Sequence, residues 1–395
     1  MTEQQTRALA YETASLSVFR GLLELSPMAA FLDFLRCTGD PVEKMYRYGK
    51  FVYSLTDYGC SFSAFLTKAV CEDENLYVRL AAKNRPVPEA AEINVQAELA
   101  LFSRLTELTP EELCAGIDGA EHVPAFCNTK TDFSALYADR LARIHQVGYG
   151  IFASAAMFRL EDNGDIVPVE AADSTTREKF IGYEAERQQV YDNTRALVDG
   201  RPAANVLLCG DAGTGKSSTV KACANDFYAE GIRLIEIRKD QLFRLSRVMG
   251  RIADNPLKFI LFIDDLSFNK NDDCFSMLKA VLEGSASAKA GNAVIYATSN
   301  RRHIVKESFS DRESSDDVHH SDTVQELMSL SDRFGLTVYF GKPDKKLYLE
   351  IVRTLADRAG VTMEQDELFR KAEAFALGRS SRSPRTAEQF ITGIL

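Results

Sequence analysis

The second half of the chain alternates between short apolar runs and longer segments with helical spacing. Because apolar strands joined by helices or long connections are typical of a parallel sheet covered on both faces, this alternation predicts an α/β fold. Residues 179–342 should form a core in which a five-stranded parallel sheet lies between helices. The five predicted strands are ANVLLC, RLIEIR, KFILFID, NAVIYATS and LTVYF.

The segments on both sides of this core have patterns of their own. In residues 148–178, Asn163 and Gly164 stand between two apolar runs. Asn-Gly readily supplies the positive φ angles of a tight turn, so a β-hairpin linker is predicted there. After the core, residues 343–395 should form a helical lid. Its predicted helices cover 344–359, 364–377 and 384–394.

Residues 1–147 are predicted to form a mostly helical N-terminal domain. Leu16, Phe19, Leu22 and Leu23 recur at the spacing of an amphipathic helix. No motif in this domain identifies its partner. A later stretch, MYRYGKFVYSLTDYG, lacks the dense basic surround of a nucleic-acid stacking platform. Its aromatic residues are therefore expected in the core or at an interface: Tyr46, Tyr48, Phe51 and Tyr53.

The composition narrows the class of protein. Of 395 residues, 45% are hydrophobic and 26% are charged, which is ordinary for soluble globular proteins. The formal net charge of -10 argues against a broad nucleic-acid surface, because phosphate binding needs clustered Lys and Arg. No apolar run approaches the ~20 residues of a membrane helix, no secretory signal is visible, and the cysteines form no C-x-x-C pair. We therefore expect a cytoplasmic protein with no membrane partner.

One segment carries a complete phosphate-binding motif. GDAGTGKS at 210–217 matches the Walker A pattern G-x-x-x-x-G-K-[ST]. Its glycines let backbone N–H groups turn around phosphate oxygens, Lys216 adds a positive charge, and the Ser217 hydroxyl can bind Mg²⁺. A chance glycine-rich turn is disfavoured, because an apolar strand precedes the motif and a helical pattern follows it. The residues expected to bind ATP are Gly210, Asp211, Ala212, Gly213, Thr214, Gly215, Lys216, Ser217 and Ser218.

A pair of acids follows another predicted strand, as in a Walker B motif. KFILFI ends in Asp264 and Asp265. Taken alone, two such acids could equally well cap the next helix as take part in catalysis. Beside a phosphate loop, however, carboxylates at the carboxyl end of a strand lie where ligands gather in a doubly wound sheet. Asp264 is therefore expected to hold Mg²⁺ together with Ser217, and Asp265 to polarise the attacking water.

Four elements in this order resemble the AAA+ superfamily: the phosphate loop, the strand ending in the two acids, NAVIYATSN and LSDRFG. The resemblance implies that Asn300 is the polar sensor that orients the lytic water beside Asp265. It also implies that Arg333 is an arginine finger that reaches the nucleotide of a neighbouring subunit and stabilises transition-state charge. A surface arginine that closes a helix before Gly335 is the alternative for Arg333.

The resemblance extends to the segments on either side of the predicted core. GRSSRSPRTAEQF is similar to the second sensor of AAA+ proteins, with Arg385 the best match and Arg379 and Arg382 as alternatives. FIGYEAERQQV is similar to the linker before the first strand, which implies that Ile181 and Gly182 line the adenine pocket.

A narrower resemblance rests on FILFIDDLSF, LKAVLEG, YATSNRRH and SLSDRFG together. These motifs resemble an uncharacterised bacterial family of stand-alone AAA+ ATP-binding proteins of unknown function. The resemblance covers roughly residues 148–395 and implies an ATPase without naming its biological role.

The function expected from these motifs is slow hydrolysis of Mg-ATP that drives conformational change or remodelling of an unknown partner. Turnover should be slow because Asp265 stands where many AAA+ ATPases carry the longer Glu. The alternatives are a nucleotide-dependent assembly switch or scaffold, and a DNA-associated ATPase similar to initiators or loaders. A homo-oligomer is expected because Arg333 is most useful in a neighbouring subunit.

Two details affect the choice of partner, which remains an unknown protein or nucleic acid. RLIEIR passes through Lys239 and Asp240 directly into a helical pattern, without the aromatic-apolar-Gly loop of AAA+ unfoldases. Threading of polypeptides is therefore disfavoured. The basic residues Arg301, Arg302 and His303 are expected to face the nucleotide or an adjoining subunit rather than DNA.

Overall fold

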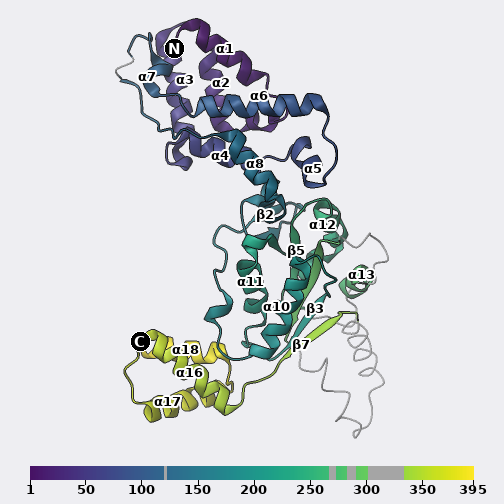
Figure 1. Ribbon diagram of the computed structural model, residues 1–395. Coiled ribbons are helices and arrows are strands. Elements are labelled where there is room, and N and C mark those ends of the chain that lie inside the picture. Colours follow the sequence, from purple (N-terminus) through teal and green to yellow (C-terminus); the bar gives the residue numbers. More distant parts are fainter. Residues whose placement is uncertain (120–121, 267–272, 283–290, 301–332) are drawn as a thin grey trace. The chain divides into compact units, whose positions relative to one another are not determined.

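The computed structural model divides into two compact units, Met1–Ser154 and Ala155–Leu395, and each is described here by itself (Figure 1). The cluster Arg301–His303 lies outside the residues that the structure describes. Among those residues, no helix is both long and apolar enough to cross a membrane. The described residues are 1–119, 122–266, 273–282, 291–300 and 333–395.

The first unit is helical, as the sequence predicts, and aromatic side chains fill its core. Phe31 and Phe51 pack with ring centroids 5.1 Å apart, and Tyr48 is fully buried. Tyr46 and Tyr53, on the same helix as Tyr48, are exposed instead. The helices are α1 (Glu3–Ala14), α2 (Ser26–Arg36), α3 (Pro41–Ser54), α4 (Phe62–Glu72), α5 (Leu76–Ala82), α6 (Glu89–Leu105), α7 (Pro110–Cys114), α8 (Phe133–Ala142) and α9 (Ile144–Val147), with 3-10 turns η1 (Arg20–Glu24), η2 (Thr56–Tyr58) and η4 (Gly150–Ala153).

The amphipathic helix predicted around Leu16–Leu23 is wrong. α1 ends at Ala14, and only the short turn η1 follows. A tertiary contact replaces the helical hydrogen bonds: the buried carboxylate of Glu98 accepts the backbone N–H groups of Ser17 at 2.7 Å and Phe19 at 2.9 Å. Leu16, Phe19 and Leu22 are buried and Leu23 is partly buried, but they do not belong to an α-helix.

The second unit contains a seven-stranded sheet with the order β2-β1-β4-β5-β6-β3-β7. The five predicted strands form and are all parallel, as expected. The predicted hairpin also forms, but it extends the same sheet, because β1 pairs in parallel with β4 and antiparallel with β2. The strands are β1 (Met157–Leu160), β2 (Ile166–Pro168), β3 (Val206–Gly210), β4 (Ile232–Glu236), β5 (Lys258–Ile263), β6 (Ala293–Ser299) and β7 (Leu336–Phe340).

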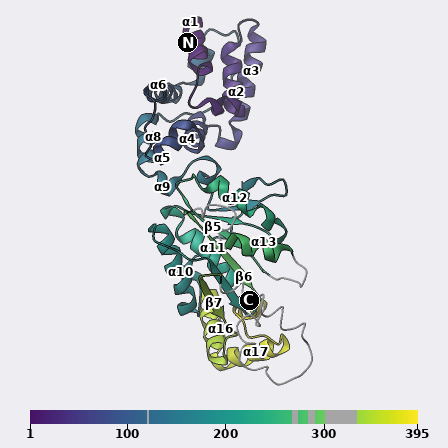
Figure 2. The ribbon, with the colours of Figure 1, turned by 90° about the vertical axis from the view of Figure 1, so that its right-hand side faces the viewer.

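Helices cover both faces of this sheet, which is why its strands read as continuous apolar runs. In Figure 2, α10 and α11 lie on one side of the sheet and α12 and α13 on the other. Ile260 and Tyr296 share a core with side chains of α10 and α11, whereas Leu261 and Ile295 line a cavity together with side chains of α12 and α13. The predicted α/β fold is thereby confirmed. The helices and turns are η5 (Arg177–Lys179), α10 (Glu184–Val198), α11 (Lys216–Asp226), η6 (Tyr228–Glu230), η7 (Lys239–Arg244), α12 (Leu245–Ile252) and α13 (Asp273–Leu282).

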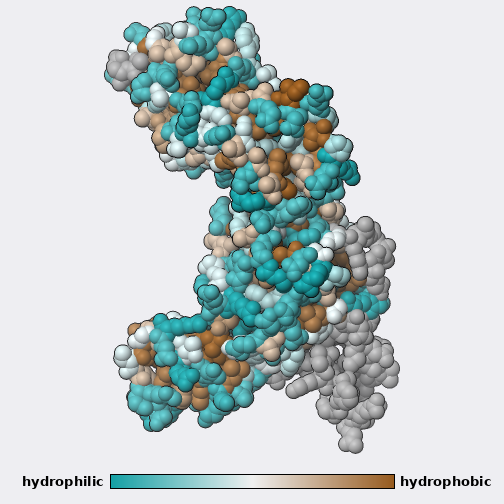
Figure 3. All heavy atoms as spheres, viewed as in Figure 1, coloured by the Kyte–Doolittle hydropathy of each residue, from teal (hydrophilic) through white to brown (hydrophobic). Residues whose placement is uncertain are grey.

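The C-terminal lid follows β7 and has its own small core around Tyr348, Ile351 and Phe390. Its helices are α16 (Lys345–Ala359), α17 (Gln365–Gly378) and α18 (Pro384–Ile394), close to the predicted limits. The visible face of the lid shows small hydrophobic patches among hydrophilic side chains (Figure 3). Asp344 and Ser383 cap α16 and α18 by accepting backbone N–H groups of the first turn, which explains where these two helices begin.

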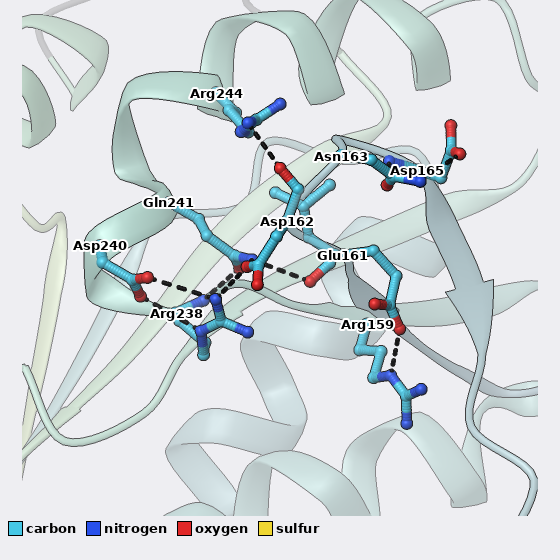
Figure 4. Close-up of polar contacts among 10 residues, drawn as sticks. Arg159, Glu161, Asp162, Asn163, Asp165, Arg238, Asp240, Gln241 and Arg244 are labelled. Carbon is cyan, nitrogen blue, oxygen red and sulfur yellow. Dashed lines mark hydrogen bonds and ion pairs between the residues drawn. The ribbon is translucent and has the colours of Figure 1, made fainter.

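The turn of the hairpin is fastened to the connection that follows β4 (Figure 4). Arg244 donates to the Asp162 carbonyl at 2.7 Å, and Gln241 donates to the Leu160 carbonyl at 3.0 Å. Arg238 forms an ion pair with the Asp162 carboxylate. The connection after β4 enters η7 directly at Lys239, so a substrate-gripping loop of the kind found in unfoldases has no room in this segment.

Candidate nucleotide-binding site

The phosphate loop joins the carboxyl end of β3 to the first turn of α11. Gly210, Gly213 and Gly215 have φ angles of 133°, 75° and 91°, a region that residues with a Cβ rarely adopt. At Gly210 a Cβ would also lie 2.1 Å from the carbonyl oxygen of Phe340, the last residue of β7. The glycines are therefore required both by backbone conformation and by the close approach of the neighbouring strand.

Lys216 opens α11 and points back into the loop. Its ammonium group donates to the Gly210 carbonyl at 3.1 Å and to the Asp211 carbonyl at 2.7 Å, and the side chain is 5% exposed. Burial lowers the pKa of Lys216, because desolvation disfavours the charged form. A phosphate placed in the loop would favour the ammonium form again, since an adjacent negative charge stabilises it.

Asp264 lies at the carboxyl end of β5, beside the first turn of α11. Its Oδ1 accepts the Ser217 hydroxyl at 2.6 Å, the Thr298 hydroxyl at 2.6 Å and the backbone N–H of Asp265 at 3.1 Å. The chain thus brings together a carboxylate and a hydroxyl, the oxygen ligands that Mg²⁺ prefers, next to the phosphate loop. These are the two residues that the sequence predicts as metal ligands.

Asp265 has an unusual backbone and a side-chain partner from the next strand. Its φ is 51°, in the left-handed region that few non-glycine residues occupy, and such conformations cluster at functional sites. Asn300, directly after β6, donates its side-chain amide to Asp265 Oδ1 at 2.8 Å. Asp265 N–H also donates to the Thr298 hydroxyl at 2.9 Å. The two side chains predicted to act on a water molecule are therefore adjacent, and both are exposed.

The lid contributes one arginine to the edge of the phosphate loop. The backbone N–H of Arg385 donates to the Gly213 carbonyl at 3.3 Å, and a Cβ on Gly213 would lie 3.1 Å from Arg385 Cβ. The two alternatives are engaged elsewhere. Arg382 forms a bidentate ion pair with Glu373, at 3.0 and 2.9 Å, and Arg379 lies over an aromatic ring of α17. Of these three arginines, Arg385 is the one whose backbone contacts the phosphate loop.

The segment predicted to line the adenine pocket lies between core and lid. Gly182 is buried with a φ of 73°, and a Cβ there would lie 2.8 Å from Leu347 Cδ1 of α16. Ile181 packs against the hydrophobic core of the lid. Tyr183 donates its hydroxyl to the Gly341 carbonyl at 2.6 Å, just after β7. The segment thus contacts the lid and the end of β7 near the phosphate loop.

Arg333 is not brought together with the other predicted residues. It precedes β7, whose first residue Leu336 pairs with Val206 and whose last residue, Phe340, pairs with Gly210. Because a five-residue strand spans roughly 15 Å, Arg333 lies near the amino ends of the strands, whereas the phosphate loop lies at their carboxyl ends. There it lines a cavity of about 470 Å³, to which the sheet and α13 contribute apolar side chains. Within one chain, this arginine is too distant to serve the loop.

Sequence reasoning missed two residues of the site. Thr298 follows an apolar run two positions before Asn300, so strand alternation predicts that both side chains lie on the same side; Thr298 contacts Asp264 and Asn300 contacts Asp265. Arg187 is 5% exposed and lies on the buried face of α10 together with Val190 and Tyr191. A charged residue at an otherwise apolar helical position is a signal that could have singled out Arg187.

Comparison with known proteins identifies one family. A family model described as "Protein of unknown function (DUF815)" matches residues 153–395. No curated protein sequence matches the chain. Among solved structures, similarity is found to a replication initiator DnaA bound to AMPPCP and single-stranded DNA, at 16% identity, and to AMPPCP-bound DnaA from Aquifex aeolicus, at 18%. Both matches have a TM-score of 0.40 and cover 57% of this chain and 66%, just under two thirds, of the other.

Proposed function

Because the chain belongs to the DUF815 family of proteins of unknown function, its activity must be inferred from the site, and we propose that it binds and slowly hydrolyses Mg-ATP as an AAA+ type ATPase. The observation that carries this proposal is the 2.6 Å hydrogen bond between Ser217 and Asp264. It joins the phosphate loop to the acidic strand end, which supports a joint role of Ser217 and Asp264 in holding Mg²⁺ near the buried ammonium group of Lys216. A coincidental glycine-rich turn would not produce this arrangement.

The proposed roles follow from charge and position. The loop amides and Lys216 would hold the β- and γ-phosphates, and Asp264 with Ser217 would hold Mg²⁺. Asp265 and Asn300 would orient the attacking water; in support, their hydrogen bond holds the carboxylate in place directly after Asp264. Hydrolysis should be slow, because the aspartate carboxylate reaches less far than that of a glutamate.

The lid and the linker would complete the nucleotide pocket. Arg385 at the rim of the loop would place its positive charge on the phosphates, and Ile181 with Gly182 would contact the adenine ring. Because both segments also contact the lid or belong to it, nucleotide binding would change how the lid sits on the core. This coupling is the conformational output that a remodelling ATPase or an assembly switch needs.

The position of Arg333 favours a homo-oligomer. Since it lies at the opposite edge of the sheet from the loop of its own chain, its charge can stabilise a transition state only in a neighbouring subunit. The partner is proposed to be a protein rather than a nucleic acid. After β4, Arg238 pairs with the acids Asp162 and Asp240 of the same chain and Arg244 donates to the Asp162 carbonyl, and the formal net charge is -10.

The test combines mass measurement with phosphate release from the full chain. The wild type should assemble with Mg-ATP and release phosphate slowly, Asp265→Asn should assemble without releasing phosphate, and Arg333→Ala should bind ATP but lose most hydrolysis. Arg370→Ala, on the exposed surface of α17, is the matched control and should behave as the wild type. A monomer whose hydrolysis is unaffected by Arg333→Ala would disprove the action between subunits.

A further inference from the structure

We propose that Arg187 is a positioning residue of the nucleotide site, a buried cation that joins the adenine segment to the phosphate loop and favours nucleotides carrying more phosphates. The inference rests on the proposed function, because it concerns how the same site selects its ligand. It assigns a role to a residue that belongs neither to the phosphate loop nor to the acidic strand end.

The environment of Arg187 is unusual for a charged side chain. It extends from the first turns of α10, is 5% exposed, and its guanidinium group lies 4.2 Å from the centroid of the Phe180 ring and 5.7 Å from that of Tyr183. Burial lowers its pKa to about 10. Glu184 and Glu186 of α10 favour its charged form, but among the described residues no ion pair with Arg187 is formed, although a buried charge ordinarily requires such a partner.

The contacts of the guanidinium group connect two parts of the predicted pocket. Nη1 donates to the carbonyl of Gly182, in the adenine segment. Nη2 would lie 3.3 Å from a Cβ on Gly215, the residue that caps α11 and precedes Lys216. Within the part of the chain that the structure describes, the buried Nε has no hydrogen-bond partner. One planar cation therefore touches both segments and retains an unused donor.

Electrostatics indicate what this cation does. A buried positive charge acts strongly on nearby negative charge, because the low dielectric of the surroundings screens it little. Directly behind Gly215, the charge of Arg187 adds to that of Lys216 and to the positive end of α11. Its effect must increase with the charge of the ligand, so it should stabilise ATP more than ADP, and ADP more than AMP. A purely structural arginine would affect the three nucleotides equally.

The experiment measures the dissociation constants of ATP, ADP and AMP for the full chain, together with the Tm of the free protein. Arg187→Met keeps the length of the side chain but removes the charge, whereas Arg187→Lys keeps the charge. The matched control is Arg195→Met, also on α10, where the arginine lies 4.6 Å from the centroid of the Phe227 ring and pairs with Glu230 at the surface.

Arg187→Met should weaken ATP binding by on the order of tenfold or more, and AMP binding much less. Arg187→Lys should keep the wild-type ratio of ATP to AMP affinity, and this variant tests the proposal even if Arg187→Met does not fold. Arg195→Met should leave all three dissociation constants unchanged. Equal losses for ATP and AMP in Arg187→Met, or a changed ratio in Arg187→Lys, would overturn the proposal. A wild type that binds no ATP, or a Lys216→Ala variant that binds it normally, would instead contradict the proposed function.

Discussion

Replacing Gly210 with alanine should destabilise the second unit, because two independent constraints at this position exclude a Cβ. The φ of Gly210 is 133°, and the added carbon would lie 2.1 Å from the carbonyl oxygen and 2.7 Å from the carbonyl carbon of Phe340. These are backbone atoms of the adjacent strand, so no side-chain rotation can relieve the overlap. The end of β7 would have to move, which breaks the 3.0 Å hydrogen bond from Asp211 N–H to the Phe340 carbonyl.

The cost can be estimated from these contacts. A sparsely populated backbone conformation costs about 1–3 kcal/mol in a non-glycine residue. Overpacking adds about 1–3 kcal/mol, and the lost backbone hydrogen bond about 1 kcal/mol. Together they predict a loss of about 3–7 kcal/mol, which for a unit of this size corresponds to a decrease in Tm of roughly 6–28 °C.

Thermal unfolding of the full chain, followed by circular dichroism or calorimetry, measures the effect of Gly210→Ala. Gly250→Ala is the matched control: a Cβ on Gly250 meets no atom within 4 Å, and alanine is favoured over glycine in a helix such as α12 by about 0.5–1 kcal/mol. Its Tm should therefore stay constant or rise slightly. If Gly210→Ala unfolds within 2–3 °C of the wild type, on the order of 1 kcal/mol, the argument from backbone crowding is refuted.

Three other changes test individual parts of the site. Thr298→Val removes a hydrogen-bond donor to Asp264 and should lower Mg²⁺-dependent hydrolysis about tenfold, whereas Thr298→Ser keeps the hydroxyl and should keep the hydrolysis. If Thr298→Val weakened ATP binding without Mg²⁺ to the same extent, a role at the metal would be contradicted. Because burial lowers the pKa of Lys216 and phosphates favour its ammonium form, ATP binding should take up protons at pH values below the ordinary lysine pKa of ~10.4. Calorimetry in two buffers measures that uptake, and an equal uptake by Lys216→Arg would exclude lysine as its source. Gly213→Ala should weaken ATP binding, since its Cβ would lie 3.1 Å from the Cβ of Arg385. Unchanged binding would show that this contact between the lid and the phosphate loop plays no part in ATP binding.

Much of the core could be predicted because its signals are local. Strands buried on both faces read as apolar runs, and the phosphate loop needs glycines and a lysine at fixed spacing, so Gly210 and Lys216 identify the site without tertiary information. The acids at the end of β5 were interpretable for the same reason: parallel strands bring their carboxyl ends to one edge of a sheet.

The features that could not be predicted depend on residues distant in sequence. Leu16 and Phe19 have helical spacing, but Glu98, on a separate helix, binds the backbone N–H groups that the helix would need. The hairpin is a local signal, whereas its pairing with β4 depends on the register between Met157 and Leu234, which no local pattern specifies. The contact of Arg187 with Gly215 belongs to this class as well.

The central claim is that the loop binds ATP through the ammonium group of Lys216. Equilibrium titration of the full chain with a fluorescent ATP analogue and Mg²⁺ tests it most directly, comparing the wild type with Lys216→Ala and with Lys221→Ala, a control on the same helix that lies outside the loop. Saturable binding by the wild type and Lys221→Ala, and its loss in Lys216→Ala, is the predicted result. Binding by Lys216→Ala with the affinity of the wild type would contradict the account.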